Sequence, residues 1–226
     1  MLIISYKSSL DFKDFLDKNN YSWIETIPNP NLDPRIADHP DLSIFPLDDK
    51  SMVIDKNLVD YYKRYIKISN IIDGEVVSPS YPKDSIYNVY KTSNYYIHND
   101  VTEKNIELFM NENNYKHLFV KQGYTRCSII PMKDKILTSD YGIYKALKEK
   151  IEVVLLEEES IPLDGFSKGF LGGCCGFFEN TLLFNGNIEK LQNYELIRDE
   201  ALKSNIKIMY PSCDLLDTGS ILCCNE

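Results

Sequence analysis

Short stretches of similar sequence recur along the chain at a nearly constant step. Ser43–Leu47 and Ser128–Met132 share the pattern Ser-Ile-x-Pro, and each is followed by charged residues. Further apolar runs continue the series at Ile86–Tyr90, Cys174–Phe178 and Ser220–Cys224. The step is roughly 42–47 residues, which lies in the range where self-similarity indicates a propeller, a solenoid or another repeat array.

Each repeat contains more than this first apolar strand. Second strands are expected at Met52–Asp55, Tyr95–His98, Lys135–Thr138 and Thr181–Asn185. Helices are expected to follow at Leu58–Tyr65, Thr102–Asn113, Asp140–Glu149 and Tyr194–Ser204. In the second and third of these stretches, apolar residues recur at helical spacing. Third strands are expected within Ile66–Val77 and at Lys116–Val120, Glu152–Leu156 and Lys207–Met209. The predicted unit is therefore strand-strand-helix-strand.

The two ends of the chain complement each other. The N-terminal segment reads as a strand (Met1–Tyr6), a helix (Ser9–Asn19) and a strand (Tyr21–Ile27), which is a unit without its first strand. Ser220–Cys224 is a first strand without the rest of a unit. Pairing them completes a fifth unit and closes a ring without exposed edges. We predict a single α/β domain over residues 1–226, a five-bladed propeller of ββαβ pseudo-repeats.

A glycine-rich segment precedes the hairpin that we expect at Cys174–Phe178 and Thr181–Asn185. Glycine weakens a strand interior, so Gly172, Gly173 and Gly176 suggest a bend or the close approach of a backbone or a ligand. Two interpretations of Cys174 and Cys175 remain open: small buried apolar residues, or a nucleophile in a cleft. Since alternate strand residues face opposite sides, only one of the two could face a given site.

Charge and cysteine usage limit the classes of function. The 226 residues carry a formal net charge of -9, which disfavours nucleic acid and anionic membranes as partners and is compatible with a small cationic molecule. The first residues read as a strand rather than an export leader, and no apolar run is long enough to span a membrane. Six cysteines without Cys-x-x-Cys spacing, and only three histidines, argue against a zinc site. We expect a cytoplasmic protein with reduced thiols, no metal and no cofactor.

Five such units, one of them split across the termini, resemble the pentein fold, the α/β propeller of the guanidino-group-modifying enzymes. The segments Gly169–Gly176, Lys121–Ser128 and Thr138–Tyr144 are similar to an uncharacterised clostridial-type branch of that superfamily. The resemblance covers nearly the whole chain. Enzymes of the superfamily attack a guanidinium carbon with a cysteine, use a histidine as general acid and base, and hold the cation with carboxylates. The superfamily also contains a non-catalytic ribosome anti-association factor, so the fold alone does not imply an enzyme.

The resemblance suggests roles for particular residues. His39-Pro40-Asp41 matches the His-x-Asp motif of several members, and Gly172–Cys175 loosely matches their glycine-rich cysteine segment. The chain departs from the pattern because this cysteine segment lies in the fourth unit rather than at the C-terminus. The histidine that usually precedes the catalytic cysteine is also absent.

Polar side chains stand just before the first strands of several units, at Asp41, Asp84, Arg126 and Asp217. In a ring these positions would converge near the axis, as a ligand site requires. The alternative is that the aspartates cap turns. Cys127 lies beside Arg126 at an equivalent position and is a third, weaker candidate nucleophile.

We therefore expect a cysteine-dependent hydrolase or transferase for a small guanidino or amidino compound. Cys174 or Cys175 would be the nucleophile and His39 the general acid and base, with substrate bound by Asp41, Asp84, Arg126 and Asp217. Two alternatives stay open. One is a non-catalytic propeller that binds a small ligand or a protein, and the other is a redox-responsive protein that uses its vicinal thiols. The sequence does not give the oligomeric state.

Overall fold

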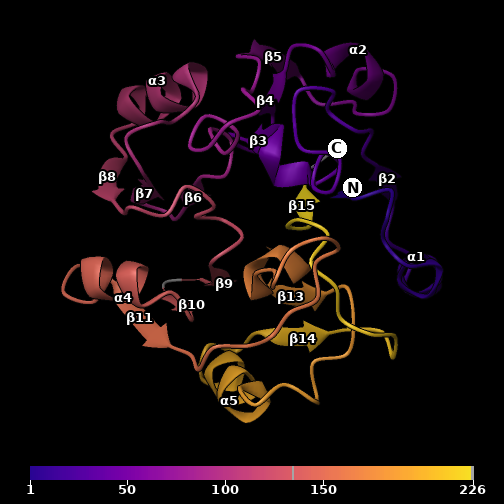
Figure 1. Ribbon diagram of the computed structural model, residues 1–226, viewed down its shortest axis with the longest axis vertical. Helices are drawn as coiled ribbons and strands as arrows, with labels where there is room; N and C mark the ends of the chain where they lie inside the picture. Colours follow the sequence, from indigo (N-terminus) through magenta and orange to yellow (C-terminus); the bar gives the residue numbers. More distant parts are fainter. Residues whose placement is uncertain (134, 225–226) are drawn as a thin grey trace.

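Five three-stranded sheets surround a common centre in the computed structural model, which describes residues 1–133 and 135–224. Looking down the ring, Figure 1 shows the sheets around the middle and the α-helices at the periphery. Within each sheet the first strand pairs antiparallel with the second, and the second pairs parallel with the third. The structure confirms a five-bladed α/β propeller.

Four units follow one another along the chain, and their elements come in the same order. The first unit contains β3 (Ile44–Pro46), β4 (Ser51–Asp55), α2 (Val59–Tyr62) and β5 (Asn70–Gly74). The second contains β6 (Tyr90–Lys91), β7 (Tyr95–His98), α3 (Lys104–Glu112) and β8 (Lys116–Phe119). The third contains β9 (Ile130–Met132), β10 (Lys135–Thr138), α4 (Tyr141–Leu147) and β11 (Glu152–Leu155). The fourth contains β12 (Cys175–Phe178), β13 (Thr181–Phe184), α5 (Tyr194–Lys203) and β14 (Lys207–Met209).

The fifth unit joins the two ends of the chain. It contains β15 (Leu222–Cys223), β1 (Leu2–Ile4), α1 (Leu10–Lys18) and β2 (Trp23–Glu25). Leu2 lies opposite Cys223 in the antiparallel β1–β15 pair, and the amino group of Met1 donates to the carbonyl oxygen of Cys224 at 2.8 Å. This pairing confirms the predicted closure of the ring.

The middle strands and the helices form for ordinary sequence reasons. Each middle strand lies between two others and is largely buried, which suits apolar runs such as Thr181–Phe184. The helices bury one apolar face, as Phe12 and Leu16 do in α1. Side chains cap the first turns of α1, α3 and α4. Asp140 caps α4 by accepting a hydrogen bond from the backbone N–H of Ile143 at 2.9 Å.

One strand differs from its prediction. Ile86–Tyr90 was expected to be the first strand of the second unit, but that strand comprises only Tyr90 and Lys91. Residues 85–88 form a turn in which the backbone N–H of Asn88 donates to the carbonyl oxygen of Ser85 at 2.8 Å. This turn occupies the position that the short 3-10 helix Pro40–Leu42 has before β3, so the unit begins later than its apolar residues suggest.

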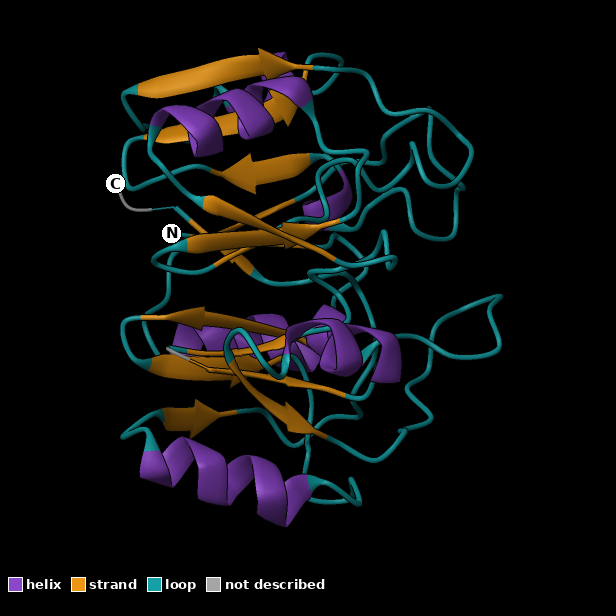
Figure 2. Ribbon diagram, turned by 90° about the vertical axis from the view of Figure 1, so that its left-hand side faces the viewer, coloured by secondary structure: helices purple, strands orange, loops and turns teal. Residues whose placement is uncertain are grey.

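The first strands of the units lie innermost, where β12 contacts both β9 and β15. In the side view of Figure 2, long loops leave the strands at one end, and short turns connect them at the other. We call these the loop end and the hairpin end of the ring. The segments that enter the first strands lie at the loop end, and the turns between first and second strands lie at the hairpin end. No helix within the described ranges has the length and apolarity needed to cross a membrane.

Candidate functional site

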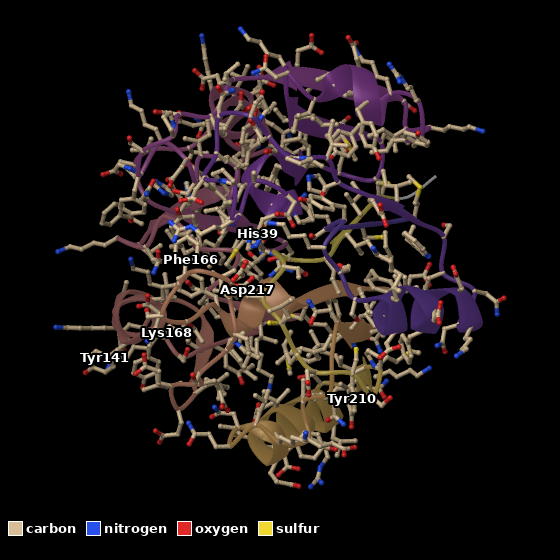
Figure 3. All side chains as sticks on the ribbon, turned by 45° about the vertical axis from the view of Figure 1, so that its right-hand side comes forward. His39, Tyr141, Phe166, Lys168, Tyr210 and Asp217 are labelled. Carbon is tan, nitrogen blue, oxygen red and sulfur yellow. The ribbon has the colours of Figure 1, made fainter. Side chains whose placement is uncertain are left out.

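A cavity of about 220 Å³ opens at the loop end of the ring. Its ionisable lining residues are His39, Tyr124, Cys127, Lys168 and Asp217, and the rest of its wall is apolar or aromatic. Figure 3 shows His39 and Asp217 near the middle of the molecule with Phe166 and Lys168 beside them, while Tyr141 and Tyr210 lie farther out. We call this the loop-end cavity.

His39 is held at the start of the 3-10 helix Pro40–Leu42 in the first unit. Its side chain is buried, and its backbone N–H donates to the carbonyl oxygen of Ile36 at 3.0 Å. The segment from the fifth unit packs closely against it, since a Cβ at Gly219 would lie 2.6 Å from that of His39. Gly219 also has a φ of +77°, a conformation that favours glycine.

Asp217 is buried beside His39, and backbone groups hold its carboxylate. The N–H of Phe170 donates to Oδ2 at 2.7 Å, and the N–H of Gly219 donates to Oδ1 at 3.0 Å. Burial raises the pKa of Asp217, while the nearby charge of His39 acts in the opposite direction. A buried carboxylate is costly when no positive charge compensates its own charge, so Asp217 is suited to bind a cation.

Cys127 brings a thiol to the same cavity from the third unit. Its Sγ lies 3.0 Å from Oδ2 of Asp41 and accepts a hydrogen bond from Nδ2 of Asn88 at 3.2 Å. Burial raises the pKa of Cys127 well above its ordinary value, and the negative charges of Asp41 and Asp217 raise it further. The thiol is therefore protonated at neutral pH and positioned to donate to Asp41.

Aromatic side chains form much of the remaining wall. The rings of Tyr124 and Phe170 lie 6.1 Å apart between centroids, and Phe166 packs against the guanidinium of Arg35 at 4.1 Å. Lys168 lines the cavity and forms an ion pair with Glu158. Flat, π-rich walls next to a carboxylate suit a planar cation.

The structure divides the predicted substrate-binding residues. Asp217 lines the loop-end cavity together with His39, and Asp41 lies behind it against Cys127. Asp84 does not line the cavity. It contacts a residue that does, because its Oδ2 accepts a hydrogen bond from the hydroxyl group of Tyr124 at 2.6 Å. Arg126 lies away from it and lines a different cavity at the hairpin end, as does Asp41.

Neither thiol of the vicinal pair lines the loop-end cavity. Cys174 and Cys175 are fully buried and pack into a hydrophobic cluster with residues such as Leu182 and Phe184. Burial raises the pKa of Cys174 well above its ordinary value and that of Cys175 to about 12. This placement matches small buried apolar residues and gives the nucleophile hypothesis for these two thiols no geometric support.

The neighbouring glycines accommodate protein atoms. A Cβ at Gly173 would lie 2.1 Å from Oδ1 of Asp217, and one at Gly172 would lie 2.4 Å from the carbonyl oxygens of Cys127 and Ile129. The close approach expected for this segment is confirmed, with Asp217 and the third unit as the approaching groups. The glycines thus contribute to the cavity by leaving room for residues that are distant in the sequence.

Sequence reasoning ranked Cys127 low and did not single out Tyr124, Phe166, Lys168 or Phe170. The sequence did hold one indication of Cys127: it precedes the first strand of its unit, β9, much as Asp41 precedes β3. Within the described residues, no group of three or more His, Cys, Asp or Glu side chains is arranged to hold a metal ion.

Solved structures of other proteins share this fold. A cysteine-to-serine variant of dimethylarginine dimethylaminohydrolase from Pseudomonas aeruginosa, complexed with citrulline, is 7% identical with a TM-score of 0.55, covering 92% of this chain and 83% of that chain. Agmatine deiminase from C. jejuni is 12% identical with a TM-score of 0.53, covering 93% and 75%. An amidinotransferase from Microseira wollei is 9% identical with a TM-score of 0.52, covering 89% and 75%.

These neighbours are pentein superfamily members, and the similarity shows that the chain has the pentein fold. No curated protein sequence matches it significantly. A family model matches residues 3–222, and its description is "Family of unknown function (DUF6873)".

Proposed function

The chain belongs to DUF6873, a family of unknown function, and we propose that it is a cysteine-dependent hydrolase or transferase for a small guanidino or amidino compound. The observation that carries the proposal is the meeting of a thiol, an imidazole and a buried carboxylate in one small cavity. Cys127, His39 and Asp217 come from the third, first and fifth units and line that cavity together. The names of the structural neighbours, which act on guanidino compounds, support this class of substrate.

Asp217 would hold the cation. A guanidinium or amidinium group presents N–H donors in a plane, which a carboxylate can accept in pairs. Aromatic side chains such as Tyr124 and Phe170 offer faces for such a planar cation. The apolar remainder of the wall excludes water and strengthens the interaction of the charges.

Cys127 would attack the central carbon of the bound group. A bond forms between Sγ and that carbon while the thiol proton passes to His39. The bond to the leaving amine then breaks, and His39 returns the proton to its nitrogen, which leaves an S-amidino adduct on the cysteine. In a hydrolase, water adds to the adduct carbon and gives a proton to His39, the C–S bond breaks, and the thiol is restored. In a transferase, an amine takes the place of the water.

A bound cation would also activate the nucleophile. In the free protein the pKa of Cys127 is raised by burial and by Asp41 and Asp217. A positive charge between Sγ and Asp217 offsets those carboxylates and lowers the pKa of the thiol. The thiolate would then form when substrate is bound and stay protonated otherwise.

The competing proposal is a non-catalytic propeller that binds a small ligand or a protein partner. The closed state of the site favours it, since His39 is 5% and Cys127 only 2% exposed. In that case the buried thiol of Cys127 and the imidazole of His39 would stabilise the propeller and take part in no reaction.

Thiol labelling with 2-chloroacetamidine, which carries an amidinium group, separates the two proposals when iodoacetamide is the neutral comparison. Peptide mass spectrometry assigns the modified cysteine. We expect 2-chloroacetamidine to label Cys127 first, and Asp217→Asn to remove the advantage of the cationic reagent. Cys174→Ala is the matched control and should label like the unmodified sequence. Equal, slow labelling by both reagents across the cysteines would overturn the enzymatic proposal.

A further inference from the structure

A second, larger cavity of about 410 Å³ lies at the hairpin end of the ring. Residues from all five first strands line it, among them Phe45, Tyr90, Pro131, Phe177 and Leu222. The loop-end cavity is lined instead by segments that precede those strands. The two cavities therefore sit at opposite ends of the innermost strands. We call the second one the hairpin-end cavity, and its size suits a small organic molecule.

Charged residues of both signs line this cavity in equal number. The carboxylates are Asp41, Asp48 and Asp49, and the cationic groups are Lys91, Arg126 and Lys133. A lining of this kind has no net charge at neutral pH, so it favours neither a pure cation nor a pure anion. A ligand that carries one charge of each sign matches it best.

Asp41 presents a buried acceptor without a partner. The side chain is 1% exposed, and its Oδ1 has no hydrogen-bond partner among the described residues. Its Oδ2, by contrast, accepts from the backbone N–H of Ser220 at 3.1 Å and lies against Cys127. A buried carboxylate oxygen left unpaired is costly, so a donor from a ligand would stabilise it.

Arg126 presents the opposite charge with only neutral partners. It donates to the carbonyl oxygens of Ile129 at 3.2 Å and Cys175 at 3.3 Å, and its guanidinium lies 6.0 Å from the centroid of the Tyr90 ring. Within residues 1–133 and 135–224 it forms no ion pair with a carboxylate. A half-buried guanidinium held by carbonyls remains able to bind a carboxylate.

We propose that the hairpin-end cavity binds a small zwitterion of the amino-acid type, with its ammonium group at Asp41 and its carboxylate at Arg126. No reaction at the loop-end cavity is needed for this binding. The two cavities are nevertheless linked through Asp41, which lines the hairpin-end cavity and whose Oδ2 touches the thiol of Cys127 in the loop-end cavity. An ammonium group at Oδ1 offsets the charge of Asp41, which makes the thiolate of Cys127 easier to form. Occupation of the hairpin-end cavity would then raise the reactivity of Cys127, and the coupling is reciprocal.

Calorimetric titration of the intact protein tests the proposal with three matched probes: L-alanine, propionate and ethylamine. L-alanine combines the two charged groups that propionate and ethylamine carry singly. We expect L-alanine to bind more tightly than either one. Asp41→Asn and Arg126→Gln should each weaken its binding by about tenfold or more, which is the loss expected for a charged hydrogen bond.

Two further variants keep the test decisive. Arg126→Lys retains the charge and should bind L-alanine better than Arg126→Gln, so a merely structural defect is distinguished from a lost ligand contact. His39→Ala alters only the loop-end cavity and should leave L-alanine binding intact, even if the proposed guanidino chemistry proves wrong. The proposal is overturned if L-alanine fails to bind at millimolar concentration, if propionate or ethylamine binds as well, or if all Asp41 and Arg126 variants bind it normally.

Discussion

The carboxylate of Asp41 and the thiol of Cys127, 86 residues apart in the sequence, are in contact, with Oδ2 lying 3.0 Å from Sγ. The same oxygen accepts the backbone N–H of Ser220, so the first, third and fifth units meet at this point. The contact places a negative charge behind the proposed nucleophile. That charge keeps the thiol protonated until a cation offsets it.

Asp41→Asn should lower the pKa of Cys127. Burial of the thiol remains, but the negative charge of Asp41 and its hydrogen bond to the thiol no longer raise that pKa. The rate of modification of Cys127 by iodoacetamide, followed against pH, should therefore rise at a lower pH than in the unmodified sequence. Asp48→Asn, which removes a carboxylate from the hairpin-end cavity without touching Sγ, is the control. An unchanged or higher midpoint for Asp41→Asn would contradict the assignment.

Asp217→Asn should weaken the preference of the loop-end cavity for cations. The amide keeps the shape of the side chain but removes the charge that would pair with an amidinium. The ratio of 2-chloroacetamidine to iodoacetamide rates at Cys127 should fall by about tenfold, as expected for a lost charged hydrogen bond. Asp84→Asn, whose carboxylate binds Tyr124 outside the cavity, should change this ratio little. If the two variants behave alike, Asp217 is not the cation-binding group.

The ion pair between Lys135 and Glu200 should contribute to stability in a pH-dependent way. Their side chains are 10% and 9% exposed, and Nζ lies 2.5 Å from Oε2. Hydrogen bonds from Lys135 and Lys203 lower the pKa of Glu200. A lowered pKa in the folded state means that the stabilisation is complete above the unfolded pKa of glutamate, about 4.3, and is lost as the pH falls through the folded value.

Urea unfolding of Glu200→Gln tests this ion pair. We expect the free energy of unfolding to fall by about 2 kcal/mol at neutral pH, since a largely buried charge loses its partner. The difference from the unmodified sequence should shrink in acid. Glu152 contacts the same lysine at 3.5 Å but is 67% exposed, so Glu152→Gln should cost less than about 0.5 kcal/mol. Equal effects of the two substitutions would contradict the predicted role of burial.

Gly173→Ala should disturb the packing around the carboxylate of Asp217. The added Cβ would lie 2.1 Å from Oδ1, and the carboxylate has little room to move because two backbone N–H groups hold it. Thermal or urea unfolding should show a loss of about 1–3 kcal/mol, the usual cost of overpacking. Gly142→Ala is the matched control on α4, where the nearest contact is an Asp140 carboxylate oxygen at 3.0 Å. An unchanged free energy of unfolding for Gly173→Ala would contradict the prediction and show that the segment can shift to make room for the methyl group.

The fold could be predicted from the sequence because the same four elements recur and the ends complete one another. Ile86–Tyr90 shows where this reasoning fails: alternation identifies apolar residues that point inward, and a turn near the axis buries such residues as well as a strand does. Asn88, in the middle of that run, serves the centre of the ring by accepting the N–H of Cys127 at 3.1 Å. The alternation of apolar residues around Asn88 does not reveal that its partner, Cys127, lies 39 residues away in the sequence.

For the site, the sequence suggested His39 and Asp217 as members of one centre, and both line the loop-end cavity. The sequence favoured Cys174 and Cys175 as the thiol, whereas the cysteine that lines this cavity is Cys127, which lies outside the glycine-rich segment. Gly172 and Gly173 do mark the site, yet they do so by leaving space for Asp217 and for the third unit. A cysteine beside glycines looks the same in sequence whether the glycines admit a substrate or a neighbouring chain segment. Only the packing of the units on one another distinguishes the two.

The pairing of β1 with β15 has a consequence for the order of events during synthesis on the ribosome. β1 precedes its antiparallel partner Leu222–Cys223 by more than two hundred residues, so it is made much earlier. Until then the edge of β1 that faces β15 is unpaired, and the carboxylate of Asp217 has not been delivered to the ring. A nascent chain therefore carries Cys127 for much of its translation without the completed cavity around it. Thiol reactivity of the kind proposed here would begin only when the ring closes.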